Sequence, residues 1–349
     1  MIRERSGCLI MNSIDKFLVD VQKPARYIGG EINSIVKDFD SADCRVAFCF
    51  PDTYEIGMSH LGMKILYHVL NEEDGCLCER VFAPWPDMEE KMRENNIKLF
   101  SLENKKGVDE FDIVGFTLQY EMSYTNILNM LDLSGIEILQ KNRKEGPFVC
   151  MGGPCAYNCE PLADFVDFVM LGEGEEIFPE VVALYKEWKK SGKSRNEYLE
   201  MLAKLEGIYV PSFYDVSYNE DGTVREIQTN NPNAAQRPRK RIIHDMDSVK
   251  YPESLIVPFA EIVHDRIMLE IFRGCTRGCR FCQAGFIYRP VREKTPAKLA
   301  SLADKLMKTT GYDEISLSSL SSSDYSKFNE LTDRLLEITE RFKNISYSI

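Results

Sequence analysis

The chain has 349 residues, with 43 lysines and arginines against 55 aspartates and glutamates, which gives a formal net charge of −12. Hydrophobic residues make up 44% and charged residues 28%, a globular composition that excludes an intrinsically disordered chain. An allowance of about 150 residues per domain predicts about two domains. No apolar run reaches about 18 residues, so the sequence predicts no transmembrane helix and no membrane partner. The net negative charge also argues against a protein that binds nucleic acid non-specifically over its whole surface.

The cysteine content is unusual, because the chain has 11 cysteines and only 4 histidines. The N-terminus lacks the long apolar core of a secretion signal, so we expect a cytoplasmic protein. In a reducing cytoplasm, grouped cysteines indicate metal or redox chemistry more often than disulfides. The cysteine clusters therefore mark candidate sites.

The first half of the chain alternates between strand and helix patterns. Residues 1–40 are predicted to be a leader, which contains a turn-rich segment at residues 23–31. In residues 41–207, strands are predicted at residues 44–51, 80–83, 97–100, 112–118, 148–151 and 165–171, and helices at residues 57–70, 87–95 (N-capped by Asp87), 124–133, 175–190 and 194–207. This alternation predicts an α/β domain with a mostly parallel sheet, whose ligands bind at the carboxyl ends of the strands.

Residues 208–264 change character and are predicted to connect two domains. Residues 208–210 and 216–228 are predicted to form a hairpin that turns at Asp221 and Gly222, a dipeptide typical of such turns. A polar, basic segment follows at residues 230–241. In residues 265–349, strands are predicted at residues 266–272, 313–317 and 345–349, and helices at residues 295–309 and 325–342. We therefore expect a second α/β domain there.

The strongest chemical signal is a cysteine motif that follows the strand at residues 266–272. Cys275, Cys279 and Cys282 have the spacing Cys-x3-Cys-x2-Cys, with glycines that allow the backbone to turn tightly. Such a loop can surround a small iron–sulfur cluster, and cubane clusters usually take four thiolates. Three thiolates leave one iron open, as catalytic zinc sites leave one position open. A zinc site or unliganded thiols are the alternatives.

This motif resembles the radical S-adenosylmethionine superfamily, in which an aromatic residue, here Phe281, precedes the last cysteine. The resemblance implies that Cys275, Cys279 and Cys282 bind a [4Fe–4S] cluster whose open iron chelates S-adenosylmethionine. It further implies reductive cleavage to a 5′-deoxyadenosyl radical, a one-electron reductant such as flavodoxin or ferredoxin, and an adenine close to Phe281. The implied fold of residues 265–349 is the first part of a partial (β/α)6 TIM-like barrel.

The turn after the second strand of this domain is the next candidate. Many members of the superfamily have a Gly-Gly-Glu-like motif there, which holds the methionine ammonium. Residues 318–324 have serines and one carboxylate but no glycine pair. By resemblance, Ser321, Ser322 and Asp324 would receive the ammonium of S-adenosylmethionine. The alternative is that residues 321–324 cap the helix that follows.

The N-terminal domain resembles the cobalamin-binding, Rossmann-like domain of cobalamin-dependent radical proteins. The positions that match its motifs are Asp52, Tyr54, Gly57, Thr117, Gly152 and Gly153. Tyr54 stands where the motif has its histidine, so the resemblance implies cobalamin without histidine ligation. The alternative is a cofactor-free domain whose glycines only form turns.

The resemblance names no substrate. The reactions expected for a radical enzyme of this kind are methyl transfer or the modification of a macromolecule. Residues 265–300 hold eight lysines and arginines against three acids, which agrees with an anionic guest such as a reduced cluster. The alternative is a solvated basic face that meets a phosphate-bearing or nucleic-acid substrate or partner. The competing hypothesis is a cluster-carrying electron-transfer or cofactor-binding protein without radical chemistry. Six strand–helix units need about 180 residues, so residues 265–349 predict a barrel that lacks its C-terminal part.

Overall fold

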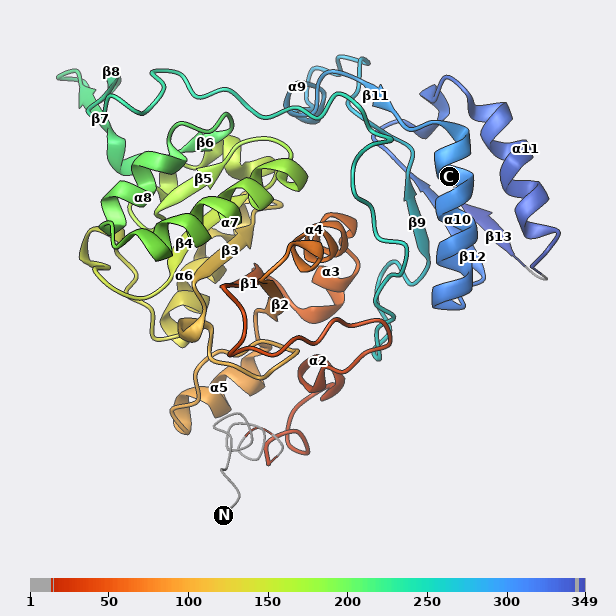
Figure 1. The fold of residues 1–349 in the computed structure, drawn as a ribbon, viewed down its shortest axis with the longest axis horizontal. Coiled ribbons are helices and arrows are strands. Elements are labelled where there is room, and N and C mark those ends of the chain that lie inside the picture. The colour runs from red at the N-terminus through yellow and green to blue at the C-terminus, as the bar shows by residue number, and fades with distance from the viewer. Residues whose placement is uncertain (1–13, 15, 343–344, 349) are drawn as a thin grey trace. The chain divides into compact units, whose positions relative to one another are not determined.

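The computed structural model describes residues 14, 16–342 and 345–348. The chain divides into two compact units (Figure 1). The first comprises Met1–Gly30, Ile35–Gly57 and Val69–Ile242, and the second comprises Glu31–Ser34, Met58–His68 and Ile243–Ile349. Residues 1–13 and 15 of the predicted leader lie outside the described residues. Within the described residues, no helix combines the length and the apolar character that a membrane crossing requires.

The first unit is built on a six-stranded sheet with the order β2-β1-β3-β4-β5-β6. The strands are β1 (Cys44–Phe50), β2 (Cys76–Phe82), β3 (Ile113–Thr117), β4 (Phe148–Gly152), β5 (Phe168–Met170) and β6 (Ile208–Tyr209). The first five are parallel, which confirms the predicted parallel sheet, and β6 pairs antiparallel with β5. The strands β2 and β3 are buried along their whole length, as expected for parallel strands covered on both faces.

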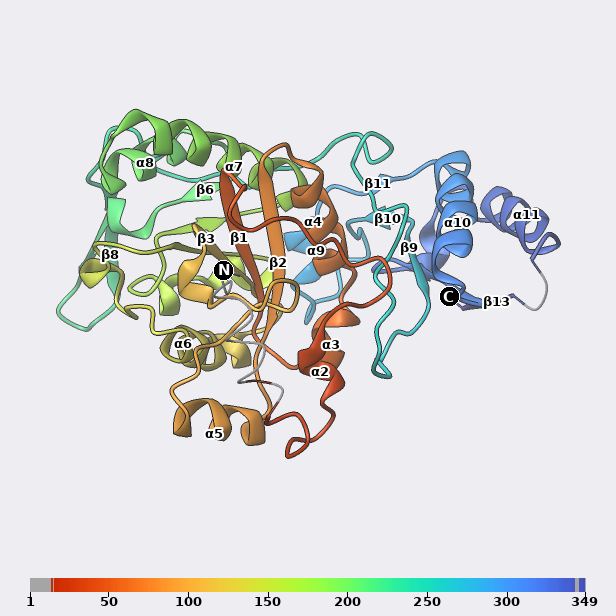
Figure 2. The same cartoon turned by 60° about the horizontal axis from the view of Figure 1, so that its bottom comes forward.

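Helices cover both faces of this sheet. The helices of the first unit are α2 (Ala25–Ile28), α3 (Tyr54–Met58), α5 (Pro86–Glu94), α6 (Tyr124–Leu133), α7 (Gly174–Ser191) and α8 (Arg195–Leu202), whereas most of α4 (Leu61–Glu72) belongs to the second unit. Figure 2 shows α7 and α8 on one face of the sheet and α5 and α6 on the other. The described part of the predicted leader joins this core, where Ile14, Val21, Tyr27 and Phe39 are buried.

Three local predictions for the first unit are wrong. Residues 97–100 form no strand, and Phe100 makes only an isolated bridge to Gly107. Residues 208–209 pair with β5 in the main sheet instead of joining the hairpin. Asp87 is not an N-cap, because α5 begins at Pro86 after Trp85, and proline is favoured at the first helical position.

The strand order positions the candidate ligand site of the first unit. From β1 the chain moves to β2 on one side, and from β3 it moves to β4 and β5 on the other. This order is the flavodoxin-like one, with its topological switch point between β1 and β3. Open α/β sheets bind ligands outside the carboxyl ends of the strands at such a point. The turns at residues 51–57 and 118–123 begin there.

The predicted hairpin follows the sheet. It consists of β7 (Tyr214–Tyr218) and β8 (Val224–Thr229), which pair antiparallel. Gly222 has a φ of +83°, which glycine adopts easily, and the Asp221 carboxylate accepts a hydrogen bond from the backbone N–H of Thr223 at 3.0 Å. The predicted Asp-Gly turn is therefore confirmed.

The second unit contains a three-stranded parallel sheet with the order β13-β12-β9. Its strands are β9 (Ile267–Glu270), β12 (Glu314–Ser318) and β13 (Ser346–Ser348), and its helices include α10 (Pro296–Thr310) and α11 (Phe328–Thr339). These two helices connect the three strands and pack against each other (Figure 1). Parallel strands that follow each other in chain order and are joined by helices have the arrangement of a (β/α) barrel.

Candidate functional site

The cysteine motif lies on a loop whose two ends are fastened together. The strands β10 (Phe272–Arg273) and β11 (Arg292–Glu293) pair antiparallel and close the base of residues 274–291. Gly274 has a φ of +93°, and a Cβ at this position would lie 2.4 Å from the carbonyl oxygen of Pro290. Only glycine fits where the two ends of the loop pass so closely. The start and the end of the loop are therefore fixed by backbone contacts.

One carboxylate, that of Glu270, joins the same two ends of the loop. Glu270, the last residue of β9, accepts hydrogen bonds from Arg273 Nε at 2.7 Å and from Lys294 Nζ at 2.7 Å. The Lys294 side chain is fully buried. Burial alone would raise the pKa of Glu270, but Arg273 and Lys294 outweigh it and lower the pKa to about 2. Glu270 is thus ionised and holds one cation from each end of the loop.

The three motif cysteines differ from the other cysteines in accessibility. Cys279 is exposed, and Cys275 and Cys282 are half-buried. The other seven cysteines of the described residues are all buried: Cys44, Cys49, Cys76, Cys78, Cys150, Cys155 and Cys159. Burial raises the pKa of several of these thiols, for example to about 11 at Cys155 and about 12 at Cys159. In the described part of the chain, only the motif cysteines are accessible thiols.

The cysteine side chains are not gathered around one point. No three histidine, cysteine, aspartate or glutamate side chains in the described residues lie close enough together to hold a metal ion. The donor set nevertheless fits an iron–sulfur cluster, because three accessible thiols share one short, glycine-containing loop. Gly278, between the first two cysteines, has a φ of +65° and gives this loop a turn that other residues rarely adopt.

The turn after β12 is joined to the cysteine loop by an ion pair. The Asp324 carboxylate accepts a hydrogen bond from Arg277 Nε at 2.6 Å, and Arg277 Nη2 binds its other oxygen. Ser321 Oγ donates to the same carboxylate at 2.8 Å. Since Arg277 lies between Cys275 and Cys279, the predicted turn is brought to the cysteine loop.

Ser322 and Phe281 are the other candidates for binding S-adenosylmethionine in this unit. Ser322 Oγ donates to the carbonyl oxygen of Leu317 at 3.3 Å. The capping alternative is wrong, because α11 starts only at Phe328 and its N-cap, Lys327, makes no side-chain capping bond. The Phe281 side chain is 94% exposed. Asp324 and Ser321 are therefore linked to the loop, whereas Phe281 extends into solvent.

The candidates after β1 are mainly packing residues. Tyr54 is 1% exposed, and its ring packs edge-on against Phe82 with the ring centres 5.3 Å apart. A Cβ on Gly57 would lie 2.3 Å from the Phe82 ring, so this glycine allows α3 to approach β2 closely. The Asp52 carboxylate accepts a hydrogen bond from the backbone N–H of Thr53 at 2.7 Å. Tyr54 and Gly57 thus contribute to the core instead of lining an open surface.

The candidates after β3 and β4 come together. The Leu118 N–H donates to the carbonyl oxygen of Gly152 at 2.7 Å, and a Cβ on Gly153 would lie 2.7 Å from the Leu118 carbonyl oxygen. Gly153 also has a φ of +100°. Thr117 Oγ1 accepts a hydrogen bond from Gln119 Nε2 at 2.6 Å. The two turns therefore form one connected surface beside the switch point.

Exposed apolar side chains also gather in the loops that follow the strands. Trp85 follows β2, Tyr120 and Met122 follow β3, and Tyr157 follows β4. Their exposed fractions are 40%, 49%, 78% and 41%. Because the strands are parallel, all four lie at the carboxyl edge of the sheet, where ligands bind. The hydrophobic pattern cannot separate such residues from core residues; only their place in turns could have indicated them.

Two family descriptions match this chain. Residues 62–211 match the family described as radical SAM proteins, N-terminal, and residues 269–349 match the radical SAM superfamily. An uncharacterized protein of Methanocaldococcus jannaschii is 29% identical over 295 residues, which cover 83% of this chain and 52% of that protein.

Among solved structures, the chain resembles the radical S-adenosylmethionine methyltransferase TsrM of Kitasatospora setae with tryptophan and a SAM analog bound. The TM-score is 0.50 at 13% identity, and the match covers 85% of this chain and 51% of TsrM. At that identity the likeness concerns the fold alone. The chain spans about half the length of these relatives. Residues 62–211 are thus similar to the N-terminal region of radical SAM proteins, and residues 269–349 are similar to the radical SAM superfamily.

Proposed function

We propose that this chain provides the cofactor-binding part of a radical S-adenosylmethionine enzyme. Cys275, Cys279 and Cys282 would hold a [4Fe–4S] cluster, which when bound supplies the electron that cleaves S-adenosylmethionine. The observation that carries this proposal is that the only accessible thiols of the described residues share one loop whose ends are fixed. A fixed base limits the conformations that the three thiols must lose when they bind one cluster.

Residues near this loop would position S-adenosylmethionine. Asp324 is ionised beside Arg277, which lowers the pKa of the carboxyl, so it can accept an ammonium group. Ser321 and Ser322 lie in the same turn. The exposed ring of Phe281, next to Cys282, offers an apolar face for the adenine. These contacts would orient the cofactor at the cluster.

We place cobalamin at the carboxyl edge of the first unit's sheet. The support is the switch point between β1 and β3, the glycine turn at residues 152–153 and the exposed side chains of Trp85, Tyr120, Met122 and Tyr157. Glycines let the backbone approach a large flat ligand. Tyr54 is buried, so the position of the motif's histidine offers no cobalt ligand.

The reaction proposed for the whole protein is methyl transfer or modification of a macromolecule. TsrM is a methyltransferase, which supports the first option. A phosphate-bearing or nucleic-acid substrate has weaker support, because Arg266, Arg273, Arg277 and Lys294 already form ion pairs with acidic residues of the same chain.

A one-electron reductant such as flavodoxin or ferredoxin would deliver the electron. The cysteine loop presents Arg280, Phe281, Phe286 and Arg289 to solvent. The guanidinium of Arg289 lies over the Phe286 ring, 5.1 Å from its centre. Residues 271–292 contain no aspartate or glutamate, so this surface would suit an acidic redox partner.

Anaerobic reconstitution tests this function. We expect about four irons and four sulfides per chain. Changing the exposed Cys279→Ala should abolish the chromophore, whereas changing the buried Cys155→Ala should preserve it. Full iron content in the Cys279→Ala protein would reject the cluster site. If the reduced cluster's electron paramagnetic resonance spectrum does not change with S-adenosylmethionine, the electron-transfer alternative replaces the radical enzyme.

A further inference from the structure

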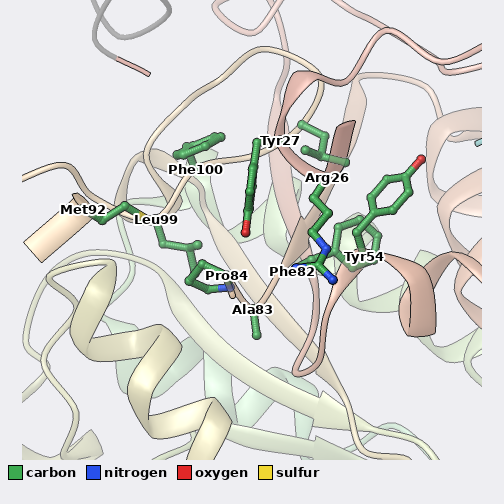
Figure 3. Close-up of a pocket in the computed structure, with 10 residues that line it drawn as sticks. Arg26, Tyr27, Tyr54, Phe82, Ala83, Pro84, Met92, Leu99 and Phe100 are labelled. Carbon is green, nitrogen blue, oxygen red and sulfur yellow. The ribbon is translucent and has the colours of Figure 1, made fainter. Parts of the chain in front are cut away.

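The turn-rich segment at residues 23–31 contributes to a small cavity in the first unit. The cavity has a volume of about 20 Å³ and lies within the first unit at the carboxyl end of β2. Such a volume holds about one water-sized group. Arg26 and Tyr27 of α2 line it together with apolar residues that include Phe82, Pro84 and Leu99. Figure 3 shows the Arg26 guanidinium and the Tyr27 hydroxyl extending toward the side where Ala83 and Pro84 lie.

Arg26 brings an unused hydrogen-bond donor to this cavity. Its Nε and Nη2 donate to the Glu55 carboxylate at 2.9–3.0 Å, and the guanidinium lies 5.0 Å from the centre of the Trp85 ring. The residue is 8% exposed. Within the described structure, Nη1 is buried and has no hydrogen-bond partner. A buried donor without a partner is costly, which favours a ligand that accepts from it.

Tyr27 supplies a second donor. Its hydroxyl oxygen accepts a hydrogen bond from the backbone N–H of Trp85 at 3.1 Å, which leaves the hydroxyl proton available to donate. Burial raises the pKa of Tyr27, so the phenol stays protonated. The other lining side chain with a polar atom is Tyr54, and its hydroxyl extends away from the cavity in Figure 3.

The charges around these two residues favour an anion. Arg26, Lys23 and Lys105 are cationic, and Lys105 Nζ donates to the Tyr27 carbonyl oxygen at 2.8 Å. Glu55 forms ion pairs with Arg26 and Lys23. The negative charge of Asp87 contributes to the raised pKa of Tyr27. Three of these five groups are cations. Both available groups are donors, which suits an anion, because donors alone satisfy its oxygens.

We propose that Arg26 and Tyr27 bind one oxygen of a small carboxylate in this cavity. The volume of the cavity matches one carboxylate oxygen, so formate, the smallest carboxylate, is the probe. The cavity adjoins Trp85, which also belongs to the surface proposed for cobalamin, so binding is tested in protein that contains neither cofactor.

Trp85 is a natural reporter, because its ring contacts Arg26 and the chain has only two tryptophans. In a Trp188→Phe background, the fluorescence of Trp85 is followed while sodium formate is added, with formamide and sodium chloride as parallel probes. We expect a saturable change with formate and none with formamide or chloride. Arg26→Gln should weaken the apparent affinity at least tenfold, and Tyr27→Phe several-fold.

Arg93→Gln is the matched control, because Arg93 is a partly exposed arginine of α5, the helix that also carries the cavity residue Met92. It should leave formate binding unchanged. The proposal is overturned if formate gives no saturable change in the parent protein, if formamide or chloride gives the same change, or if Arg26→Gln binds formate as the parent does. If Arg26→Gln does not fold, the proposal is tested by the formate titrations of Tyr27→Phe and of the parent protein. Unchanged formate affinity in Tyr27→Phe would then overturn it.

Discussion

Two turns that follow the first strand of each unit show opposite construction. After β1, Tyr54 and Gly57 are packed against Phe82, so the residues that match a cofactor motif form part of the core. After β9, Glu270 and the β10–β11 pair hold the ends of a loop whose cysteines remain accessible. The comparison teaches that a motif residue acts on a ligand only where packing leaves it accessible.

The largest contrast concerns thiol reactivity. In a Cys8→Ser background, we expect a thiol reagent to label Cys275, Cys279 and Cys282 of the cofactor-free protein quickly. The seven buried cysteines should react at least about 10³-fold more slowly, because a buried thiol must wait for the structure to open. Mass spectrometry of the labelled peptides measures this difference. Fast labelling of Cys49 or Cys150 would show that the first unit's core is open.

Glu270→Gln should destabilise the second unit by about 3 kcal/mol, because it removes the carboxylate that pairs with the buried Lys294 and with Arg273. Denaturant unfolding, followed by hydrogen exchange in residues 274–291, measures the effect. Glu314→Gln is the matched control, since Glu314 pairs with the partly exposed Arg266 and should cost far less. Equal losses in both variants would contradict the fastening role of Glu270.

The same carboxylate predicts a pH dependence. Glu270 has a pKa lowered to about 2 from 4.5, so its contribution to stability is present above pH 4.5 and is lost as the pH falls toward 2. Protonated Glu270 resembles glutamine, so the stability difference between the parent and Glu270→Gln should shrink over this interval. Unfolding at a series of pH values measures it. A difference that stays constant down to pH 2 would reject the ionised carboxylate.

A pair of glycine variants sharpens the comparison within the first unit. Gly57→Ala should cost about 1–3 kcal/mol, because its Cβ would overlap the Phe82 ring. Gly152→Ala should change stability little, since its Cβ would lie 3.5 Å or more from its neighbours. If cobalamin approaches this turn, Gly152→Ala should weaken cobalamin binding while the unfolding midpoint stays constant. Optical titration with cobalamin and thermal unfolding separate the two outcomes.

The smallest effect on stability is expected at the exposed pair between Arg277 and Asp324. Asp324→Asn should leave the unfolding midpoint unchanged, because solvent screens exposed pairs. Hydrogen exchange near Arg277 should nevertheless become faster, since the loop loses its contact with the turn after β12. Lys308→Gln, which breaks an exposed pair on α10, is the control and should not alter exchange in the loop.

Local features were predictable from the sequence, and tertiary ones were not. The strands β1, β3 and β4 were recognised because apolar runs end at proline, polar or glycine residues, and the cysteines because their spacing is a property of one short segment. The predicted helix at residues 57–70 is instead two helices, α3 and α4, and the break near Ser59 depends on contacts with residues far along the chain: the Ser59 Oγ accepts a hydrogen bond from the Val263 N–H at 2.9 Å.

The candidate sites show the same limit. The pairing of Arg277 with Asp324 joins residues 47 positions apart, and no local pattern indicates it. The packing roles of Tyr54 and Gly57 depend on Phe82, which belongs to another strand. Residues 97–100 have the apolar character of a strand, but Leu99 and Phe100 are instead buried within an irregular segment that lines the cavity beside Arg26.

The attachment of both loop ends to Glu270 has an entropic consequence. Closing a flexible loop as long as residues 274–293 costs on the order of 2–3 kcal/mol. In the folded protein the loop is already closed, because Arg273 and Lys294 both pair with Glu270. Binding of the cluster therefore does not have to close it. The three thiols are thereby held at a high effective concentration with respect to one another. Cluster assembly on this loop should therefore depend on the supply of iron and sulfide more than on folding of the chain around them.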